Sequence, residues 1–366
     1  MESPAVSAET PRSPRAASHI YLLADDLTGA CDAAGAFLSA GHSARVWLGP
    51  TAMHSASDHV QAFNTDSRSL EPAEAEVAVS NAARALKPAD GSILFKKIDS
   101  ALRGPLVAEL LAAHHAFATQ AILLAPSFPS MGRTMQGGVL HLKDACGQRD
   151  PFAVASLFPP ELQSRIAFVS RSDKLVAAYD SGKTVLLCDA TTQADLEAVA
   201  RAAQPLPRLL YAGSAGLAHA VASLLSASPA QVPLPTAERT LLISGTEHAV
   251  TRLQLERLRL NSLAADYSRV RILHICCEAG DDARILAEFE RFDPQALVLT
   301  GGETALLAAR ALGAESFILR GEFIPGIPWS IAEGGAMHGR VVITKSGGFG
   351  EPGTLSDILN TLSGQA

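Results

Sequence analysis

The segment Ile20-Tyr21-Leu22-Leu23-Ala24-Asp25-Asp26-Leu27-Thr28-Gly29 decides the fold class. Its apolar first half predicts a strand over Ile20–Ala24, and the small residues after Thr28 predict a helix over Gly29–Ala40. A strand that passes through a short polar turn directly into a helix is the building unit of layered α/β proteins.

The same alternation recurs along the chain. Further strands are expected at Ala44–Leu48, Ile93–Ile98, Ala121–Leu124, Thr184–Cys188, Leu209–Ala212, Thr240–Ser244, Arg271–Cys276, Ala296–Thr300 and Arg340–Thr344. Further helices are expected at Pro72–Leu86, Pro105–Ala118, Leu217–Leu225, from about Ala249, and at Thr304–Leu312. This pattern predicts an α/β fold with mainly parallel sheets, in which ligands bind beyond the carboxyl ends of the strands.

The length of 366 residues predicts two domains. We expect a disordered tail over residues 1–18, a first domain over 19–225 and a second over 237–366. The proline-rich stretch 226–236 reads as the linker between them. A ligand cleft is expected between the two domains.

Composition limits the function. Hydrophobic residues make up 48% of the chain and charged residues 18%, which is typical of a globular protein. The formal net charge of −7 argues against a nucleic-acid partner. No apolar run is long enough to span a bilayer, so no membrane partner is expected. Five cysteines without a C-x-x-C pair favour a reducing cytoplasm.

Two polar clusters stand at the ends of predicted strands in the first domain. Asp25 and Asp26 are costly to bury without a cation, although an aspartate there could simply cap the helix. Lys97, Asp99 and Arg103 form the second cluster, in which Arg103 shares a helical face with Asp99 if a turn begins after the strand. Such a group suits a substrate with a carboxylate and hydroxyls, and the alternative is an exposed Asp–Arg pair of little energetic value.

Two more clusters follow other apolar runs. Asn64-Thr65-Asp66-Ser67-Arg68 contributes Asp66 and Arg68, and the segment after Ala121–Leu124 contributes Arg133. Four polar clusters at four strand ends are explained most simply by one shared pocket.

Glycine-rich loops follow three strands of the second domain. They are Ser244-Gly245-Thr246, Thr300-Gly301-Gly302-Glu303-Thr304 and Lys345-Ser346-Gly347-Gly348-Phe349-Gly350. Glycines let the backbone approach a ligand, and free amides at a helix start bind phosphate. Each loop alone could be an ordinary turn, but three in one domain favour a nucleotide site.

Two other motifs are set aside. Ser181-Gly182-Lys183-Thr184 resembles the end of a P-loop, but a strand follows it where a P-loop would open a helix, so we interpret it as a turn. Cys276-Cys277 is interpreted as strand packing and not as a ligand pair.

Six ordered motifs resemble the four-carbon acid-sugar kinases and cover nearly the whole chain after the tail. They are Ala24-Asp25-Asp26-Leu27-Thr28-Gly29-Ala30 with Asp32, Lys97-Ile98-Asp99-Ser100 with Leu102-Arg103-Gly104, Phe128-Pro129 with Gly132-Arg133-Thr134, Gly213-Ser214-Ala215-Gly216-Leu217-Ala218, Gly301-Gly302-Glu303-Thr304 and Lys345-Ser346-Gly347-Gly348-Phe349-Gly350. One departure is Ala101, where the family usually has threonine.

The resemblance implies an acid-sugar-binding domain over 19–225 and a nucleotide-binding domain over 237–366, with ATP and Mg²⁺ as cofactors. It places ATP contacts on Ser244, Gly301, Gly302, Glu303, Thr304 and Gly347. It places the acid sugar on Asp25, Asp26, Lys97, Asp99 and Arg103, to which the residue pattern adds Arg68. The Mg²⁺ ligands are not identified, and a homodimer is left open.

The resulting hypothesis is phosphoryl transfer from ATP to a hydroxyl of a tetronate, a 3-oxo-tetronate or a related acid. Asp25, Asp26 or Asp99 would take the hydroxyl proton, with Asp99 slightly favoured, and Lys97 or Arg103 would hold an anionic group. Because of Ala101, a sensor that binds sugar acid and nucleotide without turnover is the alternative. A hydrolase or aldolase ranks third, since no nucleophile–base pair is apparent.

Overall fold

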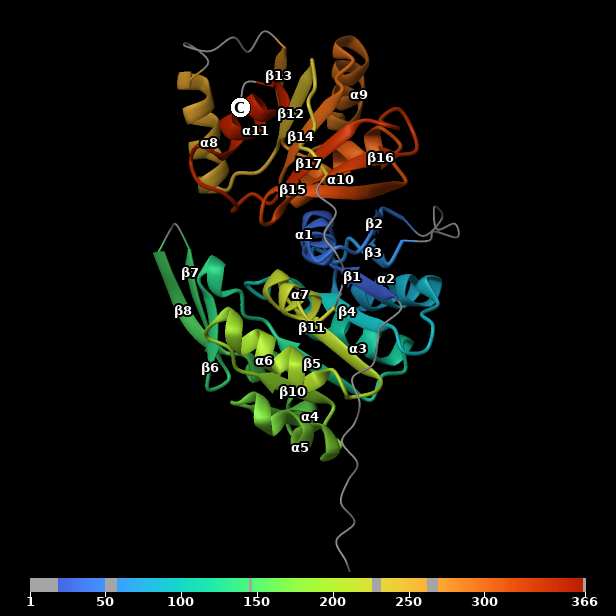
Figure 1. Ribbon diagram of the computed structural model, residues 1–366, viewed down its shortest axis with the longest axis vertical. Helices are drawn as coiled ribbons and strands as arrows, with labels where there is room; N and C mark the ends of the chain where they lie inside the picture. Colours follow the sequence, from blue (N-terminus) through green and yellow to red (C-terminus); the bar gives the residue numbers. More distant parts are fainter. Residues whose placement is uncertain (1–18, 50–57, 145–146, 226–231, 262–268, 365–366) are drawn as a thin grey trace, which may run out of the picture.

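The structure, a computed structural model, describes residues 19–49, 58–144, 147–225, 232–261 and 269–364. Figure 1 shows two stacked lobes, the lower coloured blue to yellow and the upper mainly orange and red. The predicted tail and residues 226–231 of the predicted linker lie outside the described residues. The domain boundaries therefore stay a prediction.

One sheet of 14 strands runs through both lobes. In pairing order its strands are β13 (Val270–His274), β12 (Thr240–Ser244), β14 (Ala296–Thr300), β17 (Val341–Lys345), β16 (Ile327–Glu333), β15 (Ser316–Ile324), β2 (Ala44–Trp47), β3 (Val60–Asn64), β1 (Ile20–Ala24), β4 (Ile93–Lys97), β11 (Leu209–Gly213), β5 (Ala121–Ala125), β10 (Val185–Cys188) and β9 (Ile166–Val169). A small antiparallel sheet holds β6 (Arg133–Gln136), β7 (Val139–Asp144) and β8 (Gly147–Ala153).

Helices cover both faces of the large sheet. They are α1 (Leu27–Ser39), α2 (Pro72–Leu86), α3 (Leu106–Ala116), α4 (Pro160–Gln163), α5 (Leu175–Asp180), α6 (Gln193–Ala203), α7 (Ala215–Ala222), α8 (Ala249–Asn261), α9 (Asp281–Phe292), α10 (Gly302–Ala311) and α11 (Thr354–Leu362). Side chains alternate across β1, so Leu22 and Ala24 join the apolar core under α1, whereas Leu23 joins the core under α2 and α3.

The fold class is confirmed as mixed α/β with a mainly parallel sheet, but the two expected sheets are one. Every neighbouring pair in the large sheet is parallel except the three that involve β15 and β16. The β15–β16 hairpin extends the upper part of the sheet, and β15 pairs with β2 of the lower lobe, with Phe317 opposite Val46. Arg45 strengthens this junction through a 2.9 Å bond to Ser316 and an ion pair with Glu333.

Helix α1 is shared by the two lobes. Figure 1 shows it between them, and it packs against α7 and β2 below as well as β15 and α10 above. Its residues from Leu27 to Phe37 are all buried, which its many alanines and glycines allow. The position of α1 therefore fixes how the polar residues at its start face the upper lobe. None of the helices in the described part of the chain is both long and apolar enough to cross a membrane.

Candidate active site

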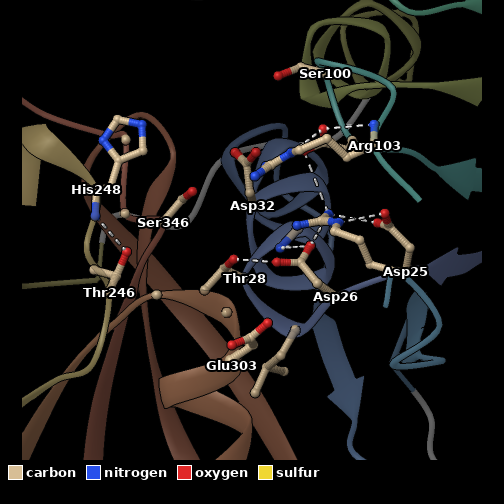
Figure 2. Close-up of a pocket in the computed structure, with 18 of the residues that line it drawn as sticks. Asp25, Asp26, Thr28, Asp32, Ser100, Arg103, Thr246, His248, Glu303 and Ser346 are labelled. Carbon is tan, nitrogen blue, oxygen red and sulfur yellow. Dashed lines mark hydrogen bonds and ion pairs between the residues drawn. The ribbon is translucent and has the colours of Figure 1, made fainter. Parts of the chain in front are cut away.

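A pocket of about 490 Å³ lies where the two lobes meet. Of the predicted site residues, all except Ser244 line it. Ser244 is buried and accepts a 3.0 Å hydrogen bond from the Thr300 hydroxyl, so it supports the loop whose next residues, Gly245 and Thr246, reach the pocket. Figure 2 shows Asp25, Asp26 and Asp32, at the start of α1 and just before it, on one side of this space and Thr246, His248 and Ser346 on the other. The predicted shared pocket thus exists, and the role of each residue stays a prediction.

Asp25 and Asp26 are held by one arginine. The Arg68 Nε and Nη2 atoms lie 2.8 and 2.9 Å from the two carboxylate oxygens of Asp25, and Nη2 lies 2.6 Å from Asp26 Oδ1. Asp26 also caps α1 by accepting a hydrogen bond from the Gly29 amide. The capping interpretation is therefore confirmed for Asp26, whose carboxylate also lines the pocket, and its role in binding stays a prediction.

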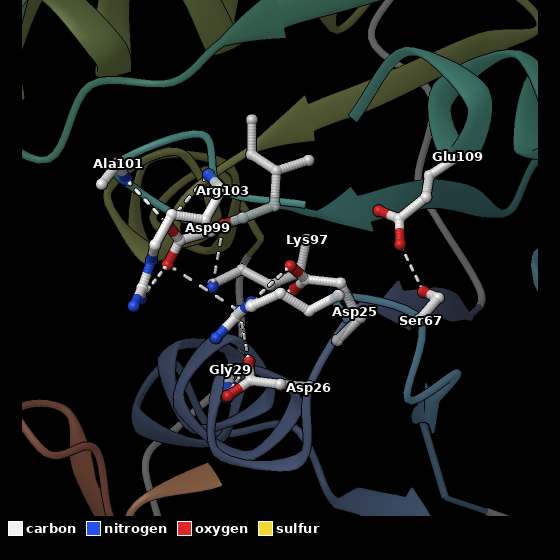
Figure 3. A network of polar contacts seen from close by, with 12 residues as sticks. Asp25, Asp26, Gly29, Ser67, Lys97, Asp99, Ala101, Arg103 and Glu109 are labelled. Atoms are coloured by element: carbon white, nitrogen blue, oxygen red, sulfur yellow. Dashed lines mark hydrogen bonds and ion pairs between the residues drawn. The ribbon is translucent and has the colours of Figure 1, made fainter. Parts of the chain in front are cut away.

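Lys97, Asp99 and Arg103 meet at the end of β4, as the sequence predicted. The Arg103 Nε and Nη2 atoms lie 2.8 and 2.7 Å from the two oxygens of Asp99. The helical turn that would place Asp99 and Arg103 on one helical face does not form, because Leu102 has a φ of 56° and the segment is a non-helical turn. The Ala101 and Arg103 amides donate to Asp99 instead. Figure 3 shows this turn folded around the Asp99 carboxylate, with Lys97 beside it.

The pKa values of these carboxylates reflect the cations around them. Burial alone would raise the pKa of Asp25, but the charges of Arg68 and Lys96 outweigh it and hold that pKa below its ordinary value. Burial likewise opposes the hydrogen bond from Arg103 and the charge of Arg68 at Asp99, and the cations win, so the pKa of Asp99 is well below its ordinary value. Both groups are thus carboxylates that bind cations and are weak as proton acceptors.

A buried ion pair supports this wall from behind. Lys96 Nζ lies 3.0 Å from Glu109 Oε2, and the two side chains are 0% and 3% exposed. The Ser67 hydroxyl, just before Arg68, donates to Glu109. Figure 3 shows Glu109 reaching from α3 to Ser67. The pair therefore connects β4, α3 and the loop that presents Arg68.

Glu109→Gln is expected to lower the free energy of unfolding by about 3–5 kcal/mol, because it removes the carboxylate that pairs with the buried Lys96 ammonium. Urea unfolding followed by circular dichroism measures this. The Lys96→Met/Glu109→Leu double variant should recover most of the loss, since it removes both charges. A double variant as unstable as Glu109→Gln would contradict the electrostatic explanation.

The upper wall of the pocket is made by glycine loops. Gly301, with a φ of 98°, precedes α10, and Gly302 begins the helix. A Cβ atom on Gly302 would lie 2.5 Å from Asp26 Oδ2, so the two lobes touch here. Gly347 stands as close to Thr246, where a Cβ would lie 2.6 Å from the threonine hydroxyl. The start of α10 thus lies against the Asp26 carboxylate.

Several lining residues were not among the predicted site residues, although Asp32, Thr246 and Phe349 belong to motifs identified in the sequence. Asp32, Thr246, His248, Arg149 and Phe349 all border the pocket. The position of Asp32, four residues after Thr28, was a usable signal, because residues i and i+4 share a helix face. No local signal marked Arg149, which comes from the small β6–β8 sheet.

Of the interpretations given to the P-loop-like segment and to the cysteine pair, the structure confirms the first and contradicts the second. Ser181–Thr184 forms the turn between α5 and β10, as predicted. The expectation that Cys276 and Cys277 pack within a strand is wrong, because β13 ends at His274. Cys277 instead lines the pocket with a φ of 59°.

Comparison with known proteins bears on both lobes. A sugar-binding N-terminal domain family matches residues 20–221, and a nucleotide-binding C-terminal domain family matches residues 279–355. A D-threonate kinase of Cupriavidus necator is 30% identical over 91% of this chain and 95% of its own length. The D-threonate kinase of Bordetella bronchiseptica is 29% identical over 92% and 96%, and a D-erythronate kinase of Heliobacterium modesticaldum 29% over 65% and 60%.

Solved structures share the fold. A Salmonella typhimurium protein superposes with a TM-score of 0.73 at 18% identity, covering 94% of this chain and 99% of that one. A Bordetella bronchiseptica protein, 26% identical with a TM-score of 0.50 over 95% and 98%, is a domain-swapped dimer with bound citrate.

Fold, pocket and relatives together define a two-lobed kinase. The chain belongs to the four-carbon acid-sugar kinase family.

Proposed function

We propose that this protein transfers the γ-phosphoryl group of ATP to a hydroxyl of a four-carbon acid sugar, a tetronate or 3-oxo-tetronate. The carrying observation is that the Asp25–Asp26–Arg68 group and the glycine loops of the other lobe face each other across one pocket, in contact at Gly302. A reaction that transfers a phosphoryl group from a polyphosphate to a polar small molecule needs one binding wall for each of the two molecules. Phosphoryl transfer depends mostly on positioning and charge stabilisation, which this arrangement offers.

We assign the acid sugar to the lower wall of the pocket, which is formed by Asp25, Asp26, Arg68, Lys97, Asp99 and Arg103. Arg103 has a side chain that is 64% exposed, and it borders the pocket together with Arg133 and Arg149. Arginine binds carboxylates in a forked geometry, so these side chains suit the acid group of a tetronate. Asp99 orients Arg103 for this role.

The nucleotide is assigned to the upper wall. The amides at the start of α10, after Gly301, suit the phosphates, because the N-terminus of a helix attracts anions. Lys345 supports the glycine loop after β17 by donating to the Ser346 and Phe349 carbonyls at 3.0 and 3.2 Å. Burial lowers the pKa of Lys345 to about 7.

Mg²⁺ fits the charge of the pocket. Seven carboxylates and five lysine or arginine side chains line it, so a triphosphate needs an added cation there. Among the described residues no group of three or more His, Cys, Asp or Glu side chains could hold a metal alone. This suits Mg²⁺, which is commonly held by one carboxylate, water and phosphate oxygens. Glu303, exposed at the start of α10, is the side chain that we assign to it.

We expect the purified protein with ATP and Mg²⁺ to release ADP when D-threonate, D-erythronate or a 3-oxo-tetronate is supplied, because its pocket has a wall for each reactant. A coupled ADP assay over this panel measures the reaction, and mass spectrometry of the product locates the phosphoryl group. Omitting the acid sugar is the control for ATP hydrolysis. Absence of acid-dependent ADP release over the whole panel would contradict the proposal.

A non-catalytic sensor is the second candidate, and Ala101 is the observation that favours it. Its methyl group borders the pocket at the position where the family usually has a hydroxyl. Calorimetry that detects binding of D-threonate and ADP, together with no turnover in the assay above, would support the sensor over the kinase.

The assembly and compartment are also proposals. We propose a homodimer, as in the Bordetella bronchiseptica relative, which light scattering would test. A cytoplasmic location is supported by the four described cysteines, all of which are free thiols.

A further inference from the structure

Asp32 is a buried acid that borders the pocket. It lies in α1, one turn after Thr28, and its side chain is among the buried polar groups with 5% relative exposure. Its Oδ1 atom is buried and has no hydrogen-bond partner among the residues that the structure describes. Figure 2 shows the Asp32 carboxylate projecting from α1 into the space between Arg103 and Ser346. An unpaired oxygen in such a place is costly unless a ligand supplies a donor.

The other aspartates of the pocket have partners already. Asp25 receives two bonds from Arg68, and Asp99 receives two from Arg103. Asp26 accepts from Arg68, from the Gly29 amide and from the Thr28 hydroxyl. Asp66 is paired with Arg310 at 3.0 Å. Asp32 therefore differs from them in having a carboxylate oxygen, Oδ1, without a hydrogen-bond partner among the described residues.

The position of Asp32 suits a group that acts between two reactants. The lower wall continues from it through Asp26, and the upper lobe approaches it through the turn after β15. A Cβ atom on Gly326, in that turn, would lie 3.5 Å from Asp32 Oδ1 and 2.7 Å from the ring of Phe349. Phe349 belongs to the glycine loop after β17. Asp32 thus lies where the wall assigned to the acid sugar meets a loop assigned to the nucleotide.

The charges that face Asp32 come from three elements. Burial raises the pKa of Asp32 to about 7, Lys97 of β4 lowers it, and Glu322 of β15 and Asp26 raise it. Glu322 accepts hydrogen bonds from the Ser39 hydroxyl at 2.8 Å and from the Gly326 amide at 2.9 Å. Its charge also raises the pKa of His219 in α7, which burial lowers by more. A proton acceptor works best when its pKa lies near the pH of the reaction. Asp25 and Asp99, whose pKa values are lowered, lack this property.

We propose that Asp32 is the general base of the reaction. This rests on the proposed function, with ATP as the phosphoryl donor. The acceptor hydroxyl gives its proton to the Asp32 carboxylate while its oxygen forms a bond to the γ-phosphorus. The bond from that phosphorus to the β–γ bridging oxygen breaks, and ADP leaves with the electron pair. Asp99, favoured from the sequence as the base, is then a positioning residue for Arg103.

Asp32→Asn tests this, since asparagine keeps the size of the side chain but does not accept a proton. We expect kcat for D-threonate or the best acid of the panel to fall at least about 100-fold. The Kd values of that acid and of a non-hydrolysable ATP analogue, measured by calorimetry, should stay within about threefold. Asp282→Asn, on the exposed face of α9, is the matched substitution away from the pocket. A smaller loss of kcat, or a loss of acid binding as large as the loss of kcat, overturns the assignment.

Two further readouts separate a base from a structural residue. The kcat/KM of the wild-type protein should fall as the pH drops below about 7, and Asp32→Asn should lack this dependence. The folded-state pKa of Asp32 lies above its unfolded value, so its contribution to stability is lost as the pH rises through about 7. Asp32→Asn should therefore be at least as stable as the wild type at pH 8. An unfolded variant overturns this account, and absence of turnover in the wild type overturns the proposed function itself.

Discussion

Replacing Arg68 by methionine is expected to lower kcat/KM by about 10²–10³-fold and the free energy of unfolding by about 3–5 kcal/mol. Asp25 is 2% exposed, and Arg68 supplies both of its side-chain ion-pair contacts. Without the guanidinium, burial of the Asp25 carboxylate lacks its largest compensation, and Asp26 loses the contact that aims it at the upper lobe. Methionine keeps much of the apolar volume of the arginine stem, so the loss reports on charge.

The stabilities of the wild type and of Arg68→Met should change with pH in opposite directions. In the wild type the pKa of Asp25 is below its unfolded value, so its contribution to stability is present above pH 4 and is lost as the pH falls. In Arg68→Met burial should raise that pKa, so stability should be lost as the pH rises. The difference between the two proteins should thus be largest near neutral pH and shrink toward pH 4. Chemical unfolding at several pH values measures it.

Arg84→Met is the control for Arg68→Met, because Arg84 lies on the exposed side of α2. It should change stability by less than about 0.5 kcal/mol and leave turnover unaltered. Equal effects in the two variants would show that Arg68 matters only as a generic surface cation. Arg68→Lys should recover part of the stability but little of the activity, since an ammonium does not match the forked contacts to Asp25.

The sequence allowed the location of the site to be predicted because parallel strands end on one side. β1, β3, β4 and β5 are neighbours or near neighbours in the sheet, so the polar residues that follow them converge. This held even for β3, which was not predicted as a strand although the cluster after it, with Arg68, was identified. A prediction of position needs only the strand ends, whereas a prediction of pairing needs the whole strand order.

The parts that were not predicted depend on contacts between distant segments. The β15–β16 hairpin joins the lobes into one sheet through pairing of residues about 270 positions apart, for which a local pattern carries no signal. The sequence allowed a helical turn after β4, but the Asp99 carboxylate accepts hydrogen bonds from the Ala101 and Arg103 amides and stabilises a different turn. The unpaired oxygen of Asp32 is likewise visible only when its neighbours are known.

Gly302→Ala is expected to reduce kcat about 100-fold while the protein remains folded. The added methyl group would lie 2.5 Å from Asp26 Oδ2 and 3.4 Å from the Thr28 hydroxyl oxygen. Asp26 has little freedom to move, because Arg68, the Gly29 amide and Thr28 all hold its carboxylate. The upper lobe must then shift away from α1, and a displacement of about 1 Å at a reacting centre costs about two orders of magnitude in rate.

Gly353→Ala separates this steric effect from the general effect of alanine at a helix start. Gly353 precedes α11 with a φ of −84°, and the nearest atom to an added Cβ would be Asp357 Oδ2 at 3.4 Å. This variant should keep wild-type kcat. In Gly302→Ala the Kd of a non-hydrolysable ATP analogue should change less than kcat, because the phosphate-binding amides of α10 remain in place while their distance from the acid sugar grows. Unchanged kcat in Gly302→Ala would mean that the bound reactants tolerate a wider separation of the two walls. Contact at Gly302 would then not be required for phosphoryl transfer.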